Sequence, residues 1–193
     1  MAEVRDEDWD GRDLLGVEYS DTAFVDVDMT QARSTNSVFD GCSFLRVRFN
    51  ATQHAGDAFV NCTFRQCSFF DAVFEGCKLI GSTFDRCTFT SMKVTGGDWS
   101  FTDFAGADLR GVAFDGVRLR ETDFTDVKAD GALLRDCDLS GAAMRGARLV
   151  ECDLRGSDLS AVDPRETNLY GAMIGERQAV ALVSSLGGVV LPD

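Results

Sequence analysis

Large apolar side chains recur at every fifth position along almost the whole chain. The series begins at Trp9 and continues to Ile174 without a shift of register, and 13 of the 15 phenylalanines belong to it. We call these positions the centres. Four of them lack a large apolar side chain: Ser34, His54, Ala129 and Pro164.

The positions on either side of each centre are restricted as well. Two residues before it the side chain is mostly small or β-branched, and all 7 cysteines fall in this position, which we call the small-residue slot. Two residues after it come 15 of the 19 glycines, which tolerate the backbone of a corner. A period of five fits neither an α-helix nor a flat strand. The pattern therefore predicts a chain that turns one corner every five residues and buries one small and one large side chain per side.

The cysteines are predicted to be core residues. In the segment CTFRQCSFFDAVFEGC, residues 62–77, they are five and ten residues apart, whereas zinc-binding thiolates usually stand two to four residues apart. Free cysteine is readily buried. Cys42 and Cys62, like Cys67 and Cys87, are predicted to stack on one another as free thiols. We expect no metal and no cofactor.

The sequence does not favour an enzyme. The only histidine, His54, occupies a centre, where we expect it to be buried beside Ser34 as a polar core pair. A Cys-His nucleophile needs hydrogen-bond reach and a third orienting group, which the pattern does not supply. No phosphate-binding loop or nucleotide fingerprint occurs, and a filled core leaves little room for a cleft.

Several segments resemble the repeat of the pentapeptide-repeat family, commonly written A(D/N)LXX. They are ADLRG at 107–111, CDLSG at 137–141, CDLRG at 152–156 and SDLSA at 157–161. The resemblance implies an all-β fold, a right-handed quadrilateral β-helix with 20 residues in each of about eight coils. On this basis residues 1–6 are an N-terminal lead-in, residues 7–176 form the β-helix, and residues 177–193 form a short C-terminal α-helix with an apolar tail.

Within that family, three segments are similar to the mycobacterial fluoroquinolone-resistance members: TQHAGDAFVNCTF at 52–64, VRLRETDF at 117–124 and GERQAVALVSSLG at 175–187. This resemblance implies a homodimeric rod that mimics DNA, binds the A or B subunit of DNA gyrase and limits quinolone action. The alternative is a generic pentapeptide-repeat scaffold or immunity-type interaction module with a different basic partner.

Charge is consistent with a basic partner. The chain carries 32 acidic against 19 basic residues, whereas direct nucleic-acid binding needs clustered Lys and Arg. Negative charge is concentrated on two opposite sides, one of them including Asp57, and in residues 1–30 and 101–193. Solubility alone also calls for some negative charge.

The aspartates of the C-terminal coils are predicted to face outward and to contact gyrase. Hydrogen bonding to the backbone at the corners is an alternative role for them. They are Asp98, Asp103, Asp108, Asp115, Asp123, Asp138, Asp153 and Asp158.

The C-terminal segment is predicted to form the dimer interface, because an open β-helix end exposes backbone and apolar core. Its apolar residues lie on one face of a short helix that Gly187 and Gly188 end, and in the tail beyond it. An intramolecular cap is the alternative. The residues are Ala179, Leu182, Val183, Leu186, Val189, Val190 and Leu191.

The acidic N-terminus and the absence of any run of 18 apolar residues predict a cytoplasmic protein without membrane contact.

Overall fold

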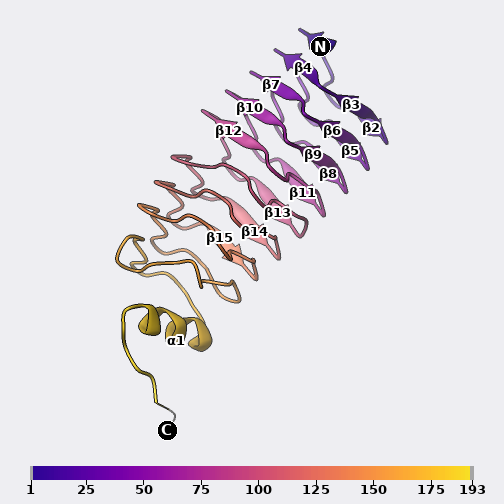
Figure 1. Ribbon diagram of the computed structural model, residues 1–193. Helices are drawn as coiled ribbons and strands as arrows, with labels where there is room; N and C mark the ends of the chain where they lie inside the picture. The colour runs from indigo at the N-terminus through magenta and orange to yellow at the C-terminus, as the bar shows by residue number, and fades with distance from the viewer. Residues whose placement is uncertain (1, 192–193) are drawn as a thin grey trace.

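The computed structural model describes residues 2–191, which form a parallel β-solenoid followed by the helix α1 (Glu176–Ser185) (Figure 1). One sheet contains β1 (Ala2–Arg5), β4 (Thr22–Val25), β7 (Ser43–Leu45), β10 (Thr63–Arg65) and β12 (Thr83–Asp85). A second contains β2 (Asp13–Leu15), β5 (Arg33–Thr35), β8 (Gln53–Ala55), β11 (Val73–Glu75), β13 (Lys93–Thr95), β14 (Ala113–Asp115) and β15 (Leu133–Arg135). A third contains β3 (Glu18–Ser20), β6 (Val38–Asp40) and β9 (Ala58–Val60).

Each coil of the solenoid contains 20 residues, because every strand pair and isolated bridge joins residues that are 20 apart. The ladder begins with Ala2 paired to Thr22 and ends with Asp153 paired to Met173. On the fourth side, isolated bridges such as Asp28 to Arg48 replace the strands. The predicted coil length and the four five-residue sides are confirmed.

The N-terminal lead-in predicted for residues 1–6 is wrong for residues 2–5. These residues form β1, which pairs with β4 in the same register as every later coil. Val4 pairs with Phe24 and lies five residues before Trp9, so it is a centre that the sequence analysis did not include. The first coil therefore begins with β1, within the stretch that was predicted to be a lead-in.

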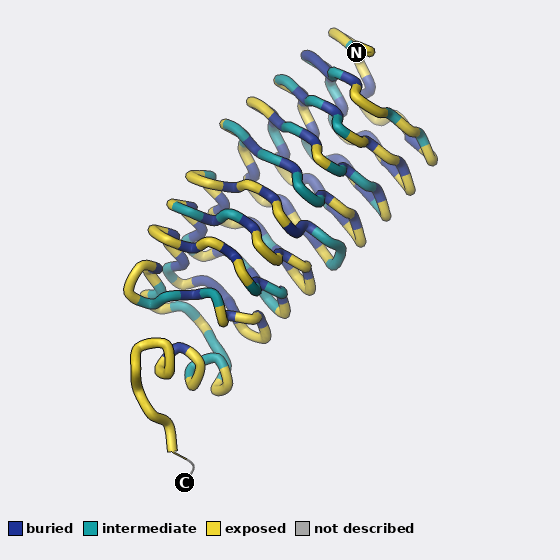
Figure 2. Tube along the Cα trace, in the orientation of Figure 1, coloured by how far each residue is buried: buried dark blue, intermediate teal, exposed yellow. Residues whose placement is uncertain are grey.

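The centres stack on one another in columns along the solenoid axis. Successive rings in one column have centroids 4.7 to 4.9 Å apart and are nearly parallel. This spacing is close to the distance between neighbouring strands, so the backbone ladder sets the stacking distance. These rings belong to Phe24, Phe44, Phe64, Phe84 and Phe104, and the next ring of the column, Phe124, lies 5.7 Å from Phe104. Buried and exposed positions alternate along every side of the rod (Figure 2).

The cysteines fill the small-residue slot, as predicted. All are free thiols; six are buried and Cys87 is partly buried. Cys62 Sγ lies 3.3 Å from the carbonyl oxygen of Phe39 in the preceding coil, which places the thiol against the backbone ladder. Burial raises the pKa of Cys77 and of Cys152 to about 12 and that of Cys137 to about 11, so these thiols stay protonated.

No helix within residues 2–191 is long and apolar enough to cross a membrane.

Gly97 occupies a small-residue slot where even a methyl group does not fit. A Cβ atom built on Gly97 would lie 2.1 Å from the carbonyl oxygen of Cys77, and its φ is +87°. Trp99, two residues later, is a fully buried centre. The close approach of the two backbones therefore requires glycine here.

We predict that Gly97→Ala lowers the free energy of unfolding by about 3 kcal/mol, because the methyl group meets rigid backbone as well as an unfavourable φ. Gly116→Ala is the matched control, because its φ is +64° and a Cβ there meets no atom within 4 Å. We expect that variant to lose only about 1 kcal/mol. Urea denaturation followed by circular dichroism measures both, and equal losses would contradict the proposed backbone contact.

Candidate surface for partner binding

Seven of the eight predicted surface aspartates also form a structural turn. Each lies one residue before a centre, and its Oδ1 accepts a hydrogen bond from the backbone N–H two residues later. The N···O distances are 3.1 Å for Asp98, 2.8 Å for Asp123 and 2.9 Å for Asp158. The same bond is made by Asp103, Asp108, Asp138 and Asp153. The alternative role given by the sequence is therefore confirmed at these seven positions. Asp103, Asp108 and Asp158 are also exposed, whereas Asp98, Asp123 and Asp138 are half-buried.

Arginines pair with four of these aspartates. Arg118 lies 2.9 Å from Asp98, and Arg155 lies 2.7 Å from Asp153. Asp108 pairs with Arg110, and Asp138 pairs at a longer distance with Arg120. Asp153 is nearly buried, which corrects the prediction that it faces outward.

The other four carry no ion pair within residues 2–191: Asp103, Asp115, Asp123 and Asp158. Asp103 and Asp123 are bridged partners in successive coils, so their charges repeat along one side of the rod. Asp115 differs from the rest, because it ends strand β14 and its carboxylate makes no turn bond among the described residues. These four aspartates are the part of the predicted surface that carries free charge.

A second set of acidic residues lies at the corners and was missed by the sequence analysis. Glu121, Asp126, Asp136 and Glu151 have φ between +51° and +56° and stand in the same corner position as 15 of the glycines. Each side chain lies over a glycine 20 residues later, and a Cβ on Gly141 would lie 2.4 Å from Glu121 Oε1. The signal in the sequence was the pairing of an acidic corner residue with a glycine one coil later.

The only histidine is paired with an aspartate in the core. His54 Nδ1 lies 2.9 Å from Asp57 Oδ2, and Asp57 Oδ1 accepts a 2.8 Å hydrogen bond from the backbone N–H of Ser37. The predicted pairing of His54 with Ser34 is therefore wrong, as is the surface position of Asp57. Asp57 occupies a small-residue slot and is fully buried, so the register places it inside, where the imidazole of His54 and the N–H of Ser37 are its hydrogen-bond partners.

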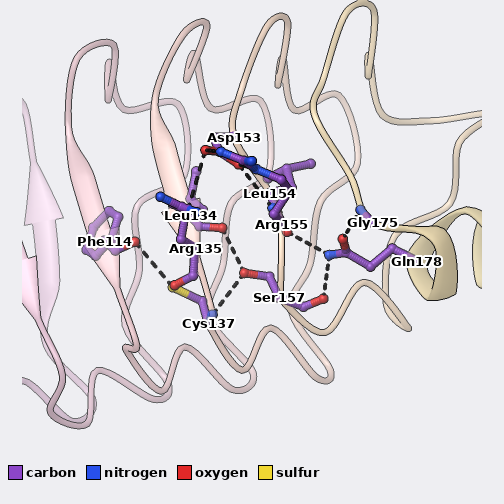
Figure 3. Close-up of polar contacts among 10 residues, drawn as sticks. All are labelled: Phe114, Leu134, Arg135, Cys137, Asp153, Leu154, Arg155, Ser157, Gly175 and Gln178. Carbon is purple, nitrogen blue, oxygen red and sulfur yellow. Dashed lines mark hydrogen bonds and ion pairs between the residues drawn. The ribbon is translucent and has the colours of Figure 1, made fainter.

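The C-terminal helix covers the last coil. Gln178 Nε2 donates hydrogen bonds of 2.6 and 2.7 Å to the carbonyl oxygens of Leu154 and Ser157, and Gln178 Oε1 accepts one from the N–H of Gly175 (Figure 3). Leu182 packs against the apolar core and is only 9% exposed, and Ala179 is half-buried. Two of the seven predicted interface residues therefore belong to an intramolecular cap.

The other five predicted interface residues remain exposed and form what we call the terminal apolar patch: Val183, Leu186, Val189, Val190 and Leu191. The helix ends in a tight turn, in which the N–H of Gly188 bonds to the carbonyl oxygen of Val183 at 2.9 Å. Gly187, with φ of +85°, makes this turn, and the tail leads away from the helix beyond it (Figure 1). The helix thus has one apolar face on the solenoid and leaves another one uncovered.

No group of three or more His, Cys, Asp or Glu side chains in the described part of the chain is arranged to hold a metal ion.

Comparisons with known proteins give one family and one fold. The family model "Pentapeptide repeat region" matches residues 67–144, and "Pentapeptide repeats (8 copies)" matches residues 147–174. Together they cover more than half of the chain. No curated protein matches the sequence.

Two solved structures of trypsin-treated QnrB1, described as a plasmid-mediated fluoroquinolone resistance protein, superpose with TM-scores of 0.78 and 0.72. They are 20% and 21% identical to this chain, and each match covers 98% of both chains. Full-length QnrB1 superposes with a TM-score of 0.50 at 21% identity, covering 96% of this chain and 100% of that one. At these identities the likeness establishes the fold.

The Asp153 ion pair predicts an acid-sensitive contribution to stability. The pKa of Asp153 is held at about 2, below its ordinary value of 3.8, chiefly because Arg155 hydrogen-bonds to the carboxylate. Since folding lowers this pKa, the pair stabilises the protein above about pH 4, and the contribution is lost as pH falls towards 2.

We therefore expect Asp153→Asn, which keeps an acceptor for the turn, to be less stable than the wild type at pH 7 and equally stable near pH 2. Urea midpoints measured across this range test the expectation. Asp158→Asn, at an equivalent turn without an ion pair, is the control. A deficit for Asp153→Asn that stays constant across the range would contradict the electrostatic explanation.

Proposed function

Because this chain belongs to the pentapeptide-repeat family, we propose that it is a DNA-mimicking protein that binds DNA gyrase, competes with DNA and so confers fluoroquinolone resistance. The observation that carries the proposal is the free acidic charge on the C-terminal coils, held on a rigid rod. The fold it shares with a fluoroquinolone resistance protein supports the same assignment.

The coil spacing makes the rod a regular charge array. Successive coils lie about 4.8 Å apart along the rod, whereas the phosphates of one DNA strand advance about 3.4 Å each along the duplex axis. The corner acids sit in the left-handed backbone conformation above glycines, and the turn aspartates are fixed by backbone N–H groups. The charges are therefore held in place before any partner binds, which lowers the entropic cost of association.

The partner surface that fits this array is basic and ordinarily binds phosphates. Gyrase must hold a DNA duplex, so an acidic rod would occupy the same cationic groups and exclude DNA. The interaction would weaken with added salt, because counterions screen it. Binding to a different basic protein, as expected of a scaffold or immunity-type module, would leave gyrase unaffected.

We also propose that the protein is a homodimer joined through the terminal apolar patch. Val189 is 83% exposed, and the patch lies at the end of the rod where the ladder stops. Burying such a patch against its equivalent would bring two rods end to end around a two-fold axis. The result would be a longer acidic surface, suited to a two-fold symmetric enzyme in the cytoplasm.

Neutralising the four unpaired aspartates should weaken the inhibition of gyrase supercoiling. We expect the quadruple variant to need at least about tenfold more protein for half-inhibition, because four rim charges worth up to about 1 kcal/mol each are lost. Asparagine keeps an acceptor at the three turn positions, so the circular dichroism should not change. The changes are Asp103→Asn, Asp115→Asn, Asp123→Asn and Asp158→Asn.

The control removes four negative charges from earlier coils, and we expect it to inhibit nearly as well as the wild type. Its changes are Asp40→Asn, Asp71→Asn, Glu75→Gln and Asp85→Asn. Undiminished inhibition by the first variant would contradict the electrostatic mechanism. Failure of the wild-type protein to inhibit gyrase would contradict the proposed function.

Charged residues in the terminal apolar patch should separate the two rods. We expect the double variant Val183→Lys and Val190→Lys to be monomeric at micromolar concentration in light scattering, where the wild type is a dimer, because each lysine would be buried unpaired. Ala181→Lys, at an exposed position about 200° around the same helix from Val183, is the control and should remain dimeric. A monomeric wild type would rule out this interface.

A further inference from the structure

Phe101 departs from the pattern that places aromatic side chains in this fold. It is one of only two phenylalanines outside the register of centres, and its side chain is 62% exposed. It stands at a corner with φ of +61°. Among the 17 non-glycine residues with positive φ in the described chain, Phe101 and Ala51 alone are apolar.

This position disfavours phenylalanine on two grounds. A residue with a Cβ is strained in the left-handed region, and glycine fills the same corner of other coils at Gly41, Gly81 and Gly141. A ring that is mostly exposed gains little from packing in return. A single exposed aromatic side chain is ordinary on protein surfaces, but one held in a strained corner is a reason to look for a binding role.

The surroundings of Phe101 combine an apolar side chain, two ion pairs and one further acid. A surface depression beside the ring is lined by the half-buried Ile80, by Ser100, by the pairs Arg118–Asp98 and Arg120–Asp138, and by Glu121. Glu121 occupies the equivalent corner one coil later, and its carboxylate has no ion pair within residues 2–191. Corners of successive coils are separated by about one strand spacing, roughly 4.8 Å.

We propose that Phe101 and Glu121 together receive an arginine side chain of the basic partner. The guanidinium would lie over the ring face while its N–H groups reach the carboxylate of Glu121. This contact rests on the proposed function, and it adds to it a feature that DNA lacks. Salt does not screen the apolar contact that an aromatic ring makes with a partner. A basic surface that lacks a group shaped to cover Phe101 would lose this contact, so the ring contributes specificity.

The test measures the affinity of each full-length variant for purified gyrase holoenzyme, alongside its melting temperature. We expect Phe101→Gly to bind about tenfold to thirtyfold more weakly, as for an aromatic residue that dominates an interface. Its melting temperature should equal or exceed that of the wild type, because glycine suits this φ. Phe101→Trp should retain wild-type affinity.

The matched control is Ser91→Gly, which places glycine at another corner with φ of +60°. It should bind like the wild type. Wild-type affinity of Phe101→Gly would overturn the proposed contact, as would an equal loss in the Ser91→Gly variant. No binding by the wild type would instead overturn the proposed function and the contact with it.

Discussion

The backbone ladder between coils is the constraint on which the rest of this structure depends. Paired residues of the ladder stand directly above those 20 positions earlier, as with Phe39 and Phe59, whose rings stack with centroids 4.6 Å apart. A side chain therefore has to suit both its own corner and the two coils next to it. Stacked rings, small residues beside them and glycines under acidic corners are all consequences of this spacing.

The same constraint explains which features the sequence could predict. A strict period of five identifies the centres, the small-residue slot and the burial of the cysteines, because each of these follows from register alone. Charge alone predicts a surface position for Asp57, whereas the register predicts correctly that its slot faces inward. The first coil was missed because Val4 is a single apolar residue within an acidic segment. Where the polarity of a residue conflicts with its position in the repeat, the position determines whether the side chain is buried.

Features that depend on contacts between distant residues could be predicted only in part. The helix was expected from its apolar face, but its cap on the last coil depends on Gln178, whose partners Leu154 and Ser157 are more than 20 residues earlier in the chain. The turn aspartates were found from their position, yet their ion pairs depend on which arginine lies nearby. The sequence therefore does not show which aspartates carry free charge on the rod. It is carried by fewer of the predicted aspartates, together with corner acids that the sequence analysis did not select.

The turn aspartates both stabilise the fold and carry surface charge, and this double role affects how a partner binds. The aspartates that make the turns cannot move away from their places, so the partner meets a fixed pattern of negative groups. Equilibrium competition tests this account most directly: gyrase is bound to a labelled DNA duplex, and the protein is titrated in at several salt concentrations. The account predicts full displacement of the DNA, with an apparent affinity that falls as salt rises. A ternary complex that retains the DNA would contradict it.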